Sequence, residues 1–404
     1  MSEQQTLGDE YVERKGIGHP DTLADLIAEE CSNEYSKYCI HAFGGILNHW
    51  FDKVVLSGGV AELAFGIKKI NKPITAYLFG KAVTSFNGKE IPIEKLFKKT
   101  CEKILKDVFQ NDEVLKHVRY VVDINDGIGF DHEKSFYFPK KKKDLITLES
   151  YKSNDTVMCS GYAPYSVAEK VTIDIENFIN SKKFKKIFGF TGFDVKVMVV
   201  RSGNTFDITL CVPFIASQTT SFEFYKKEKI HIVEEVSQFL NKYKDLKSAA
   251  IKIHLNTKDF GKRGYLVAFG SALDKGDFGA VGRGNKYSGI IAMNRKTNVE
   301  AVAGKNPLNH SGKLYTIFAH HIAWKLYKLL KINITVDIVA RNGEEISKPS
   351  IVCVNMDLSN VSNEKRTNIV RMIKADLKNI KKLTNIIIHQ DTIRQHVNRQ
   401  FIYD

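Results

Sequence analysis

The sequence predicts an α+β fold of three similar units, in which helices cover one face of each sheet. Two observations support this prediction. Amphipathic helices recur along the 404 residues, and segments near them alternate apolar with polar residues. A strand that alternates in this way has one apolar face, so helices must pack on that face to bury it. No sequence motif repeats from unit to unit, and the three-unit organisation therefore rests on the order of the elements alone.

Three amphipathic helices mark the predicted units. Residues 93–108 place apolar side chains every three to four positions along one face, from Ile93 to Val108. The segments 229–244 and 361–378 show the same periodicity. The sequence thus predicts one such helix in each unit.

Three further helices are expected at 22–38, 164–180 and 312–330. The last segment is apolar on nearly all sides, which is typical of a helix that is buried or lies at a subunit interface. His320 and His321 lie on this helix, and we interpret both as packing residues rather than ligands.

Four strands are expected beside these helices. Apolar residues alternate with polar ones over 195–199, 206–212, 251–255 and 332–338. Each strand should therefore have one buried face, which favours sheets that carry helices on one side only.

The composition is that of an ordinary globular protein, with 43% hydrophobic and 26% charged residues. No run of about 18 apolar residues exists, so no transmembrane helix is expected. The N-terminal segment lacks the apolar core of a signal peptide, and the six cysteines form no CxxC pair. These features favour a cytoplasmic protein with free thiols.

The chain is basic, with a formal net charge of +14. Such a charge admits nucleic acid, an anionic membrane or a polyphosphate as a partner. A lysine-rich surface that only interacts with water explains it equally well.

The block ERKGIGHPDTLAD (13–25) predicts a rigid turn followed by a helix. His19 and Asp21 would lie at the N-terminus of that helix, where Asp21 could act as a cap. A functional interpretation uses the same geometry, because a helix N-terminus favours anions. His19 could donate to a phosphate oxygen, and Asp21 could hold a hard cation such as Mg²⁺.

Two glycine-rich blocks combine single acids with cations and amides: GDFGAVGRGNK (276–286) and AGKNPLNHSGK (303–313). Glycines allow the backbone to approach a ligand closely, and the positive charges of Lys and Arg attract an anion. Neither block is a P-loop, and neither is a dinucleotide fingerprint or a nucleophile elbow. The turn SNDTVMCSGYAPYS (153–166) and the segment DVK (194–196) are weaker candidates, which an ordinary turn and a solvated edge would also explain.

Taken in order, these blocks resemble the S-adenosylmethionine synthetase (methionine adenosyltransferase) family, and specifically its archaeal-type branch. The resemblance is carried by GIGHPD (16–21), NDT…GYAP (154–164), GDFGAVGRGN (276–285) and AGKNPLNHSGK (303–313). It extends from about residue 10 nearly to the C-terminus. It implies three α+β subdomains around a pseudo-threefold axis, approximately 1–135, 136–275 and 276–404, interleaved within one catalytic unit. It also implies a homodimer or a dimer of dimers, with the active site at the subunit interface.

The resemblance implies a reaction between ATP and L-methionine. The methionine sulfur attacks ribose C5′ and displaces tripolyphosphate, which is then cleaved to phosphate and pyrophosphate. A thioether sulfur has a free lone pair, so no general base is required, and catalysis depends on positioning and on cations around the leaving group. Mg²⁺ is the implied cofactor, with two ions per site, and K⁺ is a further candidate.

The implied site residues follow from the matching positions. His19, Arg283 and Lys305 would be catalytic contacts of the triphosphate. The implied ATP-binding set is His19, Asp155, Asp194, Lys196, Asp277, Arg283 and Lys305. The implied methionine-binding set is Asp126, Asp155, Asp277 and Asn309, and the implied metal ligand is Asp21.

Three positions depart from the archaeal-type pattern. Phe278 stands where a second acid is usual, Asp126 where a glutamine often lies, and Lys53 where glutamine is common. The glutamine at the position of Asp126 binds methionine in the family, so transfer to a methionine analogue is an alternative. A non-catalytic, nucleic-acid-binding descendant is a second alternative, motivated by the positive charge. The main expectation excludes both nucleic acid and membrane as partners.

Overall fold

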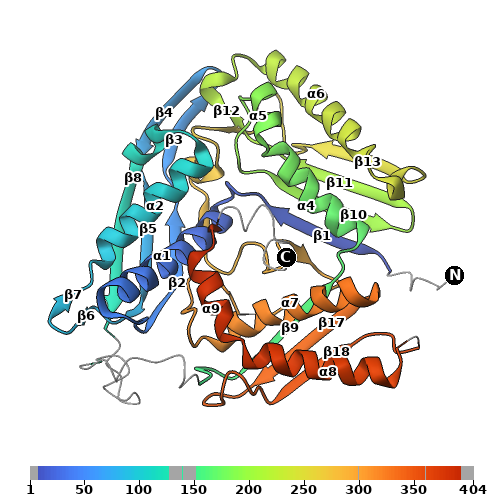
Figure 1. The fold of residues 1–404 in the computed structure, drawn as a ribbon. Helices are drawn as coiled ribbons and strands as arrows, with labels where there is room; N and C mark the ends of the chain where they lie inside the picture. Colours follow the sequence, from blue (N-terminus) through green and yellow to red (C-terminus); the bar gives the residue numbers. More distant parts are fainter. Residues whose placement is uncertain (1–7, 127–138, 140–151, 299, 360, 393–404) are drawn as a thin grey trace.

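The computed structural model describes residues 8–126, 139, 152–298, 300–359 and 361–392. Figure 1 shows three lobes, each built around one main sheet and the helices beside it, and the described residues also form three two-stranded sheets, β3-β4, β6-β7 and β12-β14. This arrangement confirms the predicted α+β class. The pseudo-threefold relation of the three lobes remains a prediction.

The N-terminal lobe contains a four-stranded sheet in the order β15-β2-β5-β8. Helices α1 and α2 pack beside it, and both predicted segments are confirmed, although α1 begins and ends beyond its predicted bounds. The elements of this lobe are α1 (Pro20–Phe43), β2 (His49–Ser57), β3 (Val60–Ala64), β4 (Ile67–Lys72), β5 (Ile74–Ala82), β6 (Ser85–Phe86), β7 (Lys89–Glu90), α2 (Ile93–Phe109), β8 (Val118–Asn125) and β15 (Phe278–Ala280).

The central lobe contains a five-stranded sheet in the order β13-β11-β10-β1-β16. Helix α6 begins earlier than predicted because the Ser221 side chain accepts a hydrogen bond from the Phe224 N–H and caps the helix there. The elements are β1 (Glu10–Lys15), α4 (Val167–Ile179), α5 (Lys182–Ile187), β10 (Lys196–Ser202), β11 (Thr205–Cys211), β12 (Phe214–Ile215), α6 (Phe222–Leu240), β13 (Ala250–Leu255), β14 (Leu266–Val267) and β16 (Ile291–Ala292).

The C-terminal lobe contains a three-stranded sheet in the order β18-β17-β9. Helix α7 packs against β9 and β17 and is buried along most of its length, His320 included. Its apolar surface is therefore explained within the chain and does not itself argue for a subunit interface. The elements are β9 (Val157–Ala163), α7 (Ser311–Leu330), β17 (Ile334–Ala340), β18 (Ile351–Asn355), α8 (Asn363–Lys378) and α9 (Lys381–His389).

Each sheet combines segments that are far apart in the sequence. Strand β1 pairs with β10, β15 pairs with β2, and β9 pairs with β17. The predicted subdomain boundaries near residues 135 and 275 therefore do not coincide with sheet boundaries, and the proposed division stays a prediction.

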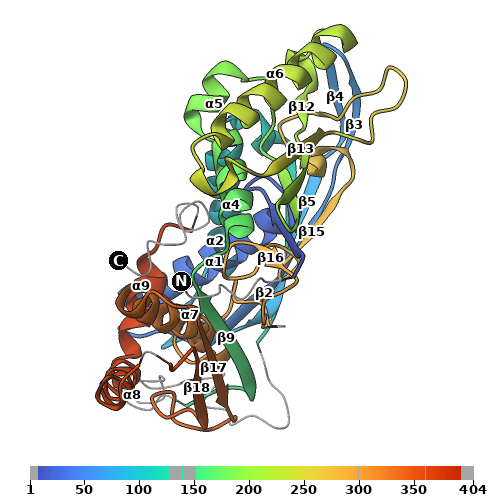
Figure 2. The same cartoon turned by 90° about the vertical axis from the view of Figure 1, so that its right-hand side faces the viewer.

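The sheets have one face covered by helices and one open face, as Figure 2 shows with most helices to the left and most strands to the right. In β1, Val12 and Arg14 are buried whereas Tyr11 is exposed, and in β10 Val197 and Val199 are buried whereas Met198 is exposed. Alternation along a strand therefore separates a core face from an open face. No helix in the described part of the chain is long and apolar enough to cross a bilayer.

Candidate active site

Burial and the hydrogen bond at the N-terminus of α1 together determine the charge and the tautomer of His19. His19, and not Asp21 as the sequence suggested, is the N-cap residue, and its Nδ1 accepts a hydrogen bond from the Asp21 N–H at 3.1 Å. Burial is the main cause that lowers the pKa of His19 to about 4, so the ring is neutral near neutral pH. A neutral imidazole that accepts at Nδ1 carries its proton on Nε2. His19 is thus prepared to donate a hydrogen bond from Nε2.

Asp21 follows His19 and has a partner at each carboxylate oxygen. Oδ1 accepts the Ala280 N–H at 3.0 Å, and Oδ2 lies 2.9 Å from the Lys15 ammonium. No group of three or more His, Cys, Asp or Glu side chains that could hold a metal occurs among the described residues. Mg²⁺ is commonly held by one or two carboxylates together with substrate phosphates, and a single acid here fits that mode.

The first glycine-rich block lies directly on α1. A Cβ at Gly279 would overlap the Pro20 carbonyl, so this position needs glycine for the close approach. Asp25 accepts the Gly282 N–H at 2.9 Å. The Asn285 side chain accepts the Lys15 N–H at 2.9 Å and donates to the Lys15 carbonyl at 2.7 Å. These contacts bring Asp277 and Arg283, which are both exposed, to the same end of the lobe as His19.

The segment 194–196 joins this end of the lobe from β10. Lys196 lies opposite Lys15 in the β1–β10 ladder and pairs with Glu13 at 3.1 Å. Asp194 is buried, and its Oδ2 accepts the Ala272 N–H at 2.9 Å. Burial raises the pKa of Asp194 to about 7. Asp194 thus holds the loop that precedes Asp277.

We call His19, Asp21, Asp194, Lys196, Asp277 and Arg283 the His19 group. Charges within and beside this group interact, since the pKa of His19 responds to the charges of Asp21, Lys15, Asp277 and Lys196. The structure therefore brings together six of the ten predicted site residues.

A second set, Lys305, Asn309 and Asp155, forms the Lys305 group at the start of α7. The Lys305 side chain is 8% exposed, its ammonium contacts Glu300, and Asp52 lies 3.8 Å away. The Asn154 N–H points to the Asn309 carbonyl at 3.4 Å, and Ser311 Oγ donates to the Asp155 carbonyl at 3.2 Å. The buried Asn309 Oδ1 accepts no hydrogen bond from the described residues.

The backbone at Lys305 is clamped by a buried ion pair. Glu29 of α1 accepts the Gly304 N–H at 3.0 Å, and Lys313 of α7 donates to the Lys305 carbonyl at 2.9 Å. Glu29 and Lys313 pair with one another at 2.7 Å. Gly304 has φ +75°, and a Cβ there would overlap the Phe51 carbonyl. The position of Lys305 is therefore fixed from two helices and a strand.

Asp126 belongs to neither group. It follows the last residue of β8, where Asn125 pairs with Lys81, Lys81 pairs with Trp50, and Trp50 forms a bridge with Lys305. Three strand spacings separate Asn125, the residue before Asp126, from Lys305, or roughly 14 Å. Lys53 pairs with Asp52 at 2.5 Å. Residues 127–138, which follow Asp126, lie outside the part of the chain that the structure describes.

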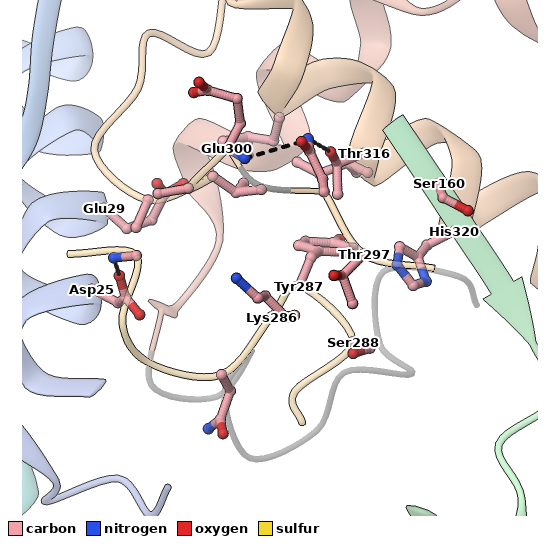
Figure 3. A pocket seen from close by; sticks show the side chains of 18 of the residues that line it. Asp25, Glu29, Ser160, Lys286, Tyr287, Ser288, Thr297, Glu300, Thr316 and His320 are labelled. Carbon is pink, nitrogen blue, oxygen red and sulfur yellow. Dashed lines mark hydrogen bonds between the residues drawn. The ribbon is translucent and has the colours of Figure 1, made fainter. Parts of the chain in front are cut away.

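Figure 3 shows a pocket between α1, α7, α9 and residues 282–303. Its volume is about 100 Å³, whereas sites for ligands of drug size span roughly 300–1,000 Å³. None of the predicted site side chains line this pocket, although Gly282 and Glu300 adjoin Arg283 and Lys305. This pocket is therefore too small to hold ATP, and it lies beside the two groups rather than within them.

Sequence analysis missed four residues that position the site. Asn285 and Lys313 lie inside the quoted blocks, and Lys15 immediately precedes Gly16. These three could have been found as polar residues next to conspicuous glycines. Glu29 lies in mid-helix without any local signal, so only its contact with Gly304 reveals it.

Known proteins similar to this chain share one family. The model of the family described as S-adenosylmethionine synthetase (AdoMet synthetase) matches residues 1–391. An S-adenosylmethionine synthase of Pyrococcus furiosus is 36% identical over 86% of this chain and 85% of its own length. That of Sulfolobus acidocaldarius is 33% identical over 95% of this chain and 94% of its own length.

The fold has a counterpart among solved structures. An unusual S-adenosylmethionine synthetase from Campylobacter jejuni superposes with a TM-score of 0.58 at 14% identity, and the match covers 96% of this chain and 94% of that one. This similarity supports the fold alone, whereas the relatives above support the activity. The chain therefore belongs to the S-adenosylmethionine synthetase family, whose members are methionine adenosyltransferases.

Proposed function

We propose that the chain forms S-adenosylmethionine from ATP and L-methionine at a site that a second copy of the chain completes. One observation carries this proposal: the implied residues form two groups rather than one. The His19 group has the cations and acids for a triphosphate with Mg²⁺. The Lys305 group adds a cation and the Asn309 amide, whose buried Oδ1 has no partner among the described residues.

The chemistry assigned to these residues follows from the leaving group. As C5′–O breaks, negative charge grows on the triphosphate, and preorganised donors stabilise it more than they stabilise bound ATP. His19 would donate from Nε2, while Arg283, Lys196 and Lys305 would supply positive charge. Asp21 would hold Mg²⁺, which when bound neutralises phosphate oxygens. Asp155, Asp277 and Asn309 would orient adenosine and methionine.

A second subunit is suggested by the open faces of the sheets. Large apolar side chains are exposed there at alternate strand positions, namely Tyr11, Phe79, Met158, Met198, Phe278 and Ile351. Lys15 lies on the same face as Tyr11, four residues away along β1, and Lys196 lies on the same face as Met198, two residues away along β10, because residues separated by an even number point to the same side. Exposed apolar surface of this kind marks association sites.

We expect a homodimer, or a dimer of dimers, at micromolar concentration. Charged substitutions of Met158 and Met198, which are 76% and 39% exposed, should shift the mass towards the monomer and reduce activity in parallel. Light scattering together with activity measurements checks this expectation. A monomeric wild-type chain with full activity would contradict it.

The activity itself is tested directly. Purified protein is incubated with ATP, Mg²⁺, K⁺ and a panel of thioether amino acids, and the sulfonium products are identified by mass spectrometry. S-Adenosylmethionine should be the main product. Absence of any sulfonium product would refute the proposed function, and preference for another thioether would support the alternative substrate. The cytoplasmic location remains a prediction from the scattered cysteines.

Asp126 provides the sequence reason for the alternative substrate. An ionised aspartate only accepts hydrogen bonds and repels a substrate carboxylate, whereas the glutamine amide both donates and accepts. Asp126→Gln is therefore expected to change the KM for methionine more than the KM for ATP. Steady-state kinetics with each substrate varied in turn measures both KM values. Asp131→Asn is the control for an alignment to the family pattern that is shifted by one position. An unchanged KM for methionine would remove this reason to expect unusual specificity.

A further inference from the structure

Lys15 contacts members of the His19 group, although the motif GIGHPD (16–21) begins one residue after it and none of the implied roles includes it. Its ammonium is 2.9 Å from Asp21 Oδ2 and donates to the Arg283 carbonyl at 2.6 Å. Its side chain is only 14% exposed. Its backbone is held at both polar groups by Asn285. Lys15 thus connects β1, the start of α1 and the first glycine-rich block.

Lys15 differs from a purely structural cation, such as its neighbour Arg14, in the face of the sheet on which it lies. Its neighbour Arg14 points to the core face, where it is fully buried and pairs with Glu176 at 2.7 Å. Lys15 lies on the open face, directly opposite Lys196 in the antiparallel ladder. Like charges at directly opposite positions are unfavourable, and here each lysine has an acid, Asp21 or Glu13.

We propose that Lys15 is a further triphosphate-binding cation that exchanges partners: it occupies Asp21 in the absence of metal and moves to phosphate oxygens when Mg²⁺ and ATP bind. This inference rests on the proposed function. It assigns a role to a residue whose position alone suggests only an ion pair.

The partners of Asp21 favour the exchange. Asp21 Oδ1 accepts the Ala280 N–H and Oδ2 faces the Lys15 ammonium, so a metal bound at Oδ2 would share that oxygen with Lys15. An ammonium and a divalent cation at one oxygen repel each other. When the metal takes Oδ2, the displaced ammonium remains largely shielded from water and needs a new anion.

The triphosphate supplies that anion on the open face. Glu13 already pairs with Lys196, so it is not free for Lys15. Two lysines held side by side on a ladder present two ammonium groups to one polyanion, and the nearby helix N-terminus favours the same charge. The electrostatic contribution of Lys15 to the lowered pKa of His19 places both at the same end of the site.

The test is Lys15→Met in the full-length protein, with Lys15→Arg as the conservative variant and Lys95→Met, on the exposed face of α2, as the control. Mn²⁺ affinity without nucleotide is measured by electron paramagnetic resonance. Tripolyphosphate affinity with saturating Mg²⁺ is measured by calorimetry with diimidotriphosphate, a non-hydrolysable analogue, because the proposed activity cleaves tripolyphosphate itself. Removal of a competing ammonium should strengthen Mn²⁺ binding severalfold, whereas loss of a charged hydrogen bond should weaken tripolyphosphate binding by about 10-fold or more.

Opposite changes of the two affinities are specific to partner exchange. A purely structural ion pair predicts that both affinities fall together, or that neither changes, and either result overturns the proposal. Lys15→Arg should retain tripolyphosphate binding within about threefold, because it keeps the charge. Neither binding measurement requires turnover, so failure of the exchange is distinguishable from failure of the wild type to form a sulfonium product.

Discussion

Replacing Lys305 with alanine is expected to lower turnover by roughly 10²–10³ at saturating ATP and methionine, with a smaller change in the KM for ATP. The charge of the leaving triphosphate grows as C5′–O breaks, so a fixed cation contributes more to the transition state than to bound substrate. Steady-state kinetics separates the two effects as kcat and KM.

The structure makes this substitution a clean deletion of charge. The peptide at Lys305 is held through backbone groups by Glu29 and Lys313, and these contacts do not involve the Lys305 side chain. Asp52 retains Lys53 as its partner, and Glu300 is 40% exposed to water. Lys95→Ala, at an exposed position of α2, is the matched control. Turnover of Lys305→Ala within about threefold of wild type would place Lys305 outside the site.

The longer helices and four of the strands, β10, β11, β13 and β17, could be predicted because their signals are local. Periodicity predicted helices at 93–108 and 361–378, and the structure has α2 and α8 there. The same signal does not say what covers an apolar face. Helix α7 has the pattern of either a core or an interface, and only its packing against β9 and β17 shows that it is core.

Strand partners could not be predicted, since pairing depends on contacts between distant segments. Strand β1 pairs with β10, more than 180 positions away, and the short β15 pairs with β2. No local property of residues 10–15 indicates the register that sets Lys15 opposite Lys196. For the same reason the sequence offered no sign that the implied residues would form two groups.

The candidate residues were predictable where their chemistry was concentrated near glycines, as at His19, Asp277 and Arg283. The residues that hold them were not, because a mid-helix acid such as Glu29 resembles any solvated acid until its contacts are known. Asp194 illustrates the converse: its segment suggested a ligand contact, and its carboxylate holds the Ala272 backbone.

His19 caps α1, and we propose that it also donates to the triphosphate; His19→Asn is expected to remove only the second role. Asparagine is among the best N-cap residues, so the start of α1 and the stability of the fold should be kept. The shorter side chain cannot place a donor where Nε2 lies. Adenosyl transfer should therefore fall by roughly 10²-fold, the usual cost of losing one preorganised donor.

His19→Ala is the matched variant, since it removes both the donor and the cap. It should lose turnover to a similar degree and, in addition, about 1 kcal/mol in the free energy of unfolding, because the Asp21 N–H loses its acceptor. Urea unfolding gives the stability of each variant, and single-turnover formation of the sulfonium product gives the chemical step. If His19→Asn transfers adenosyl at the wild-type rate while His19→Ala is only less stable, the imidazole is a helix cap and the departing triphosphate is stabilised by the lysines and Arg283 alone.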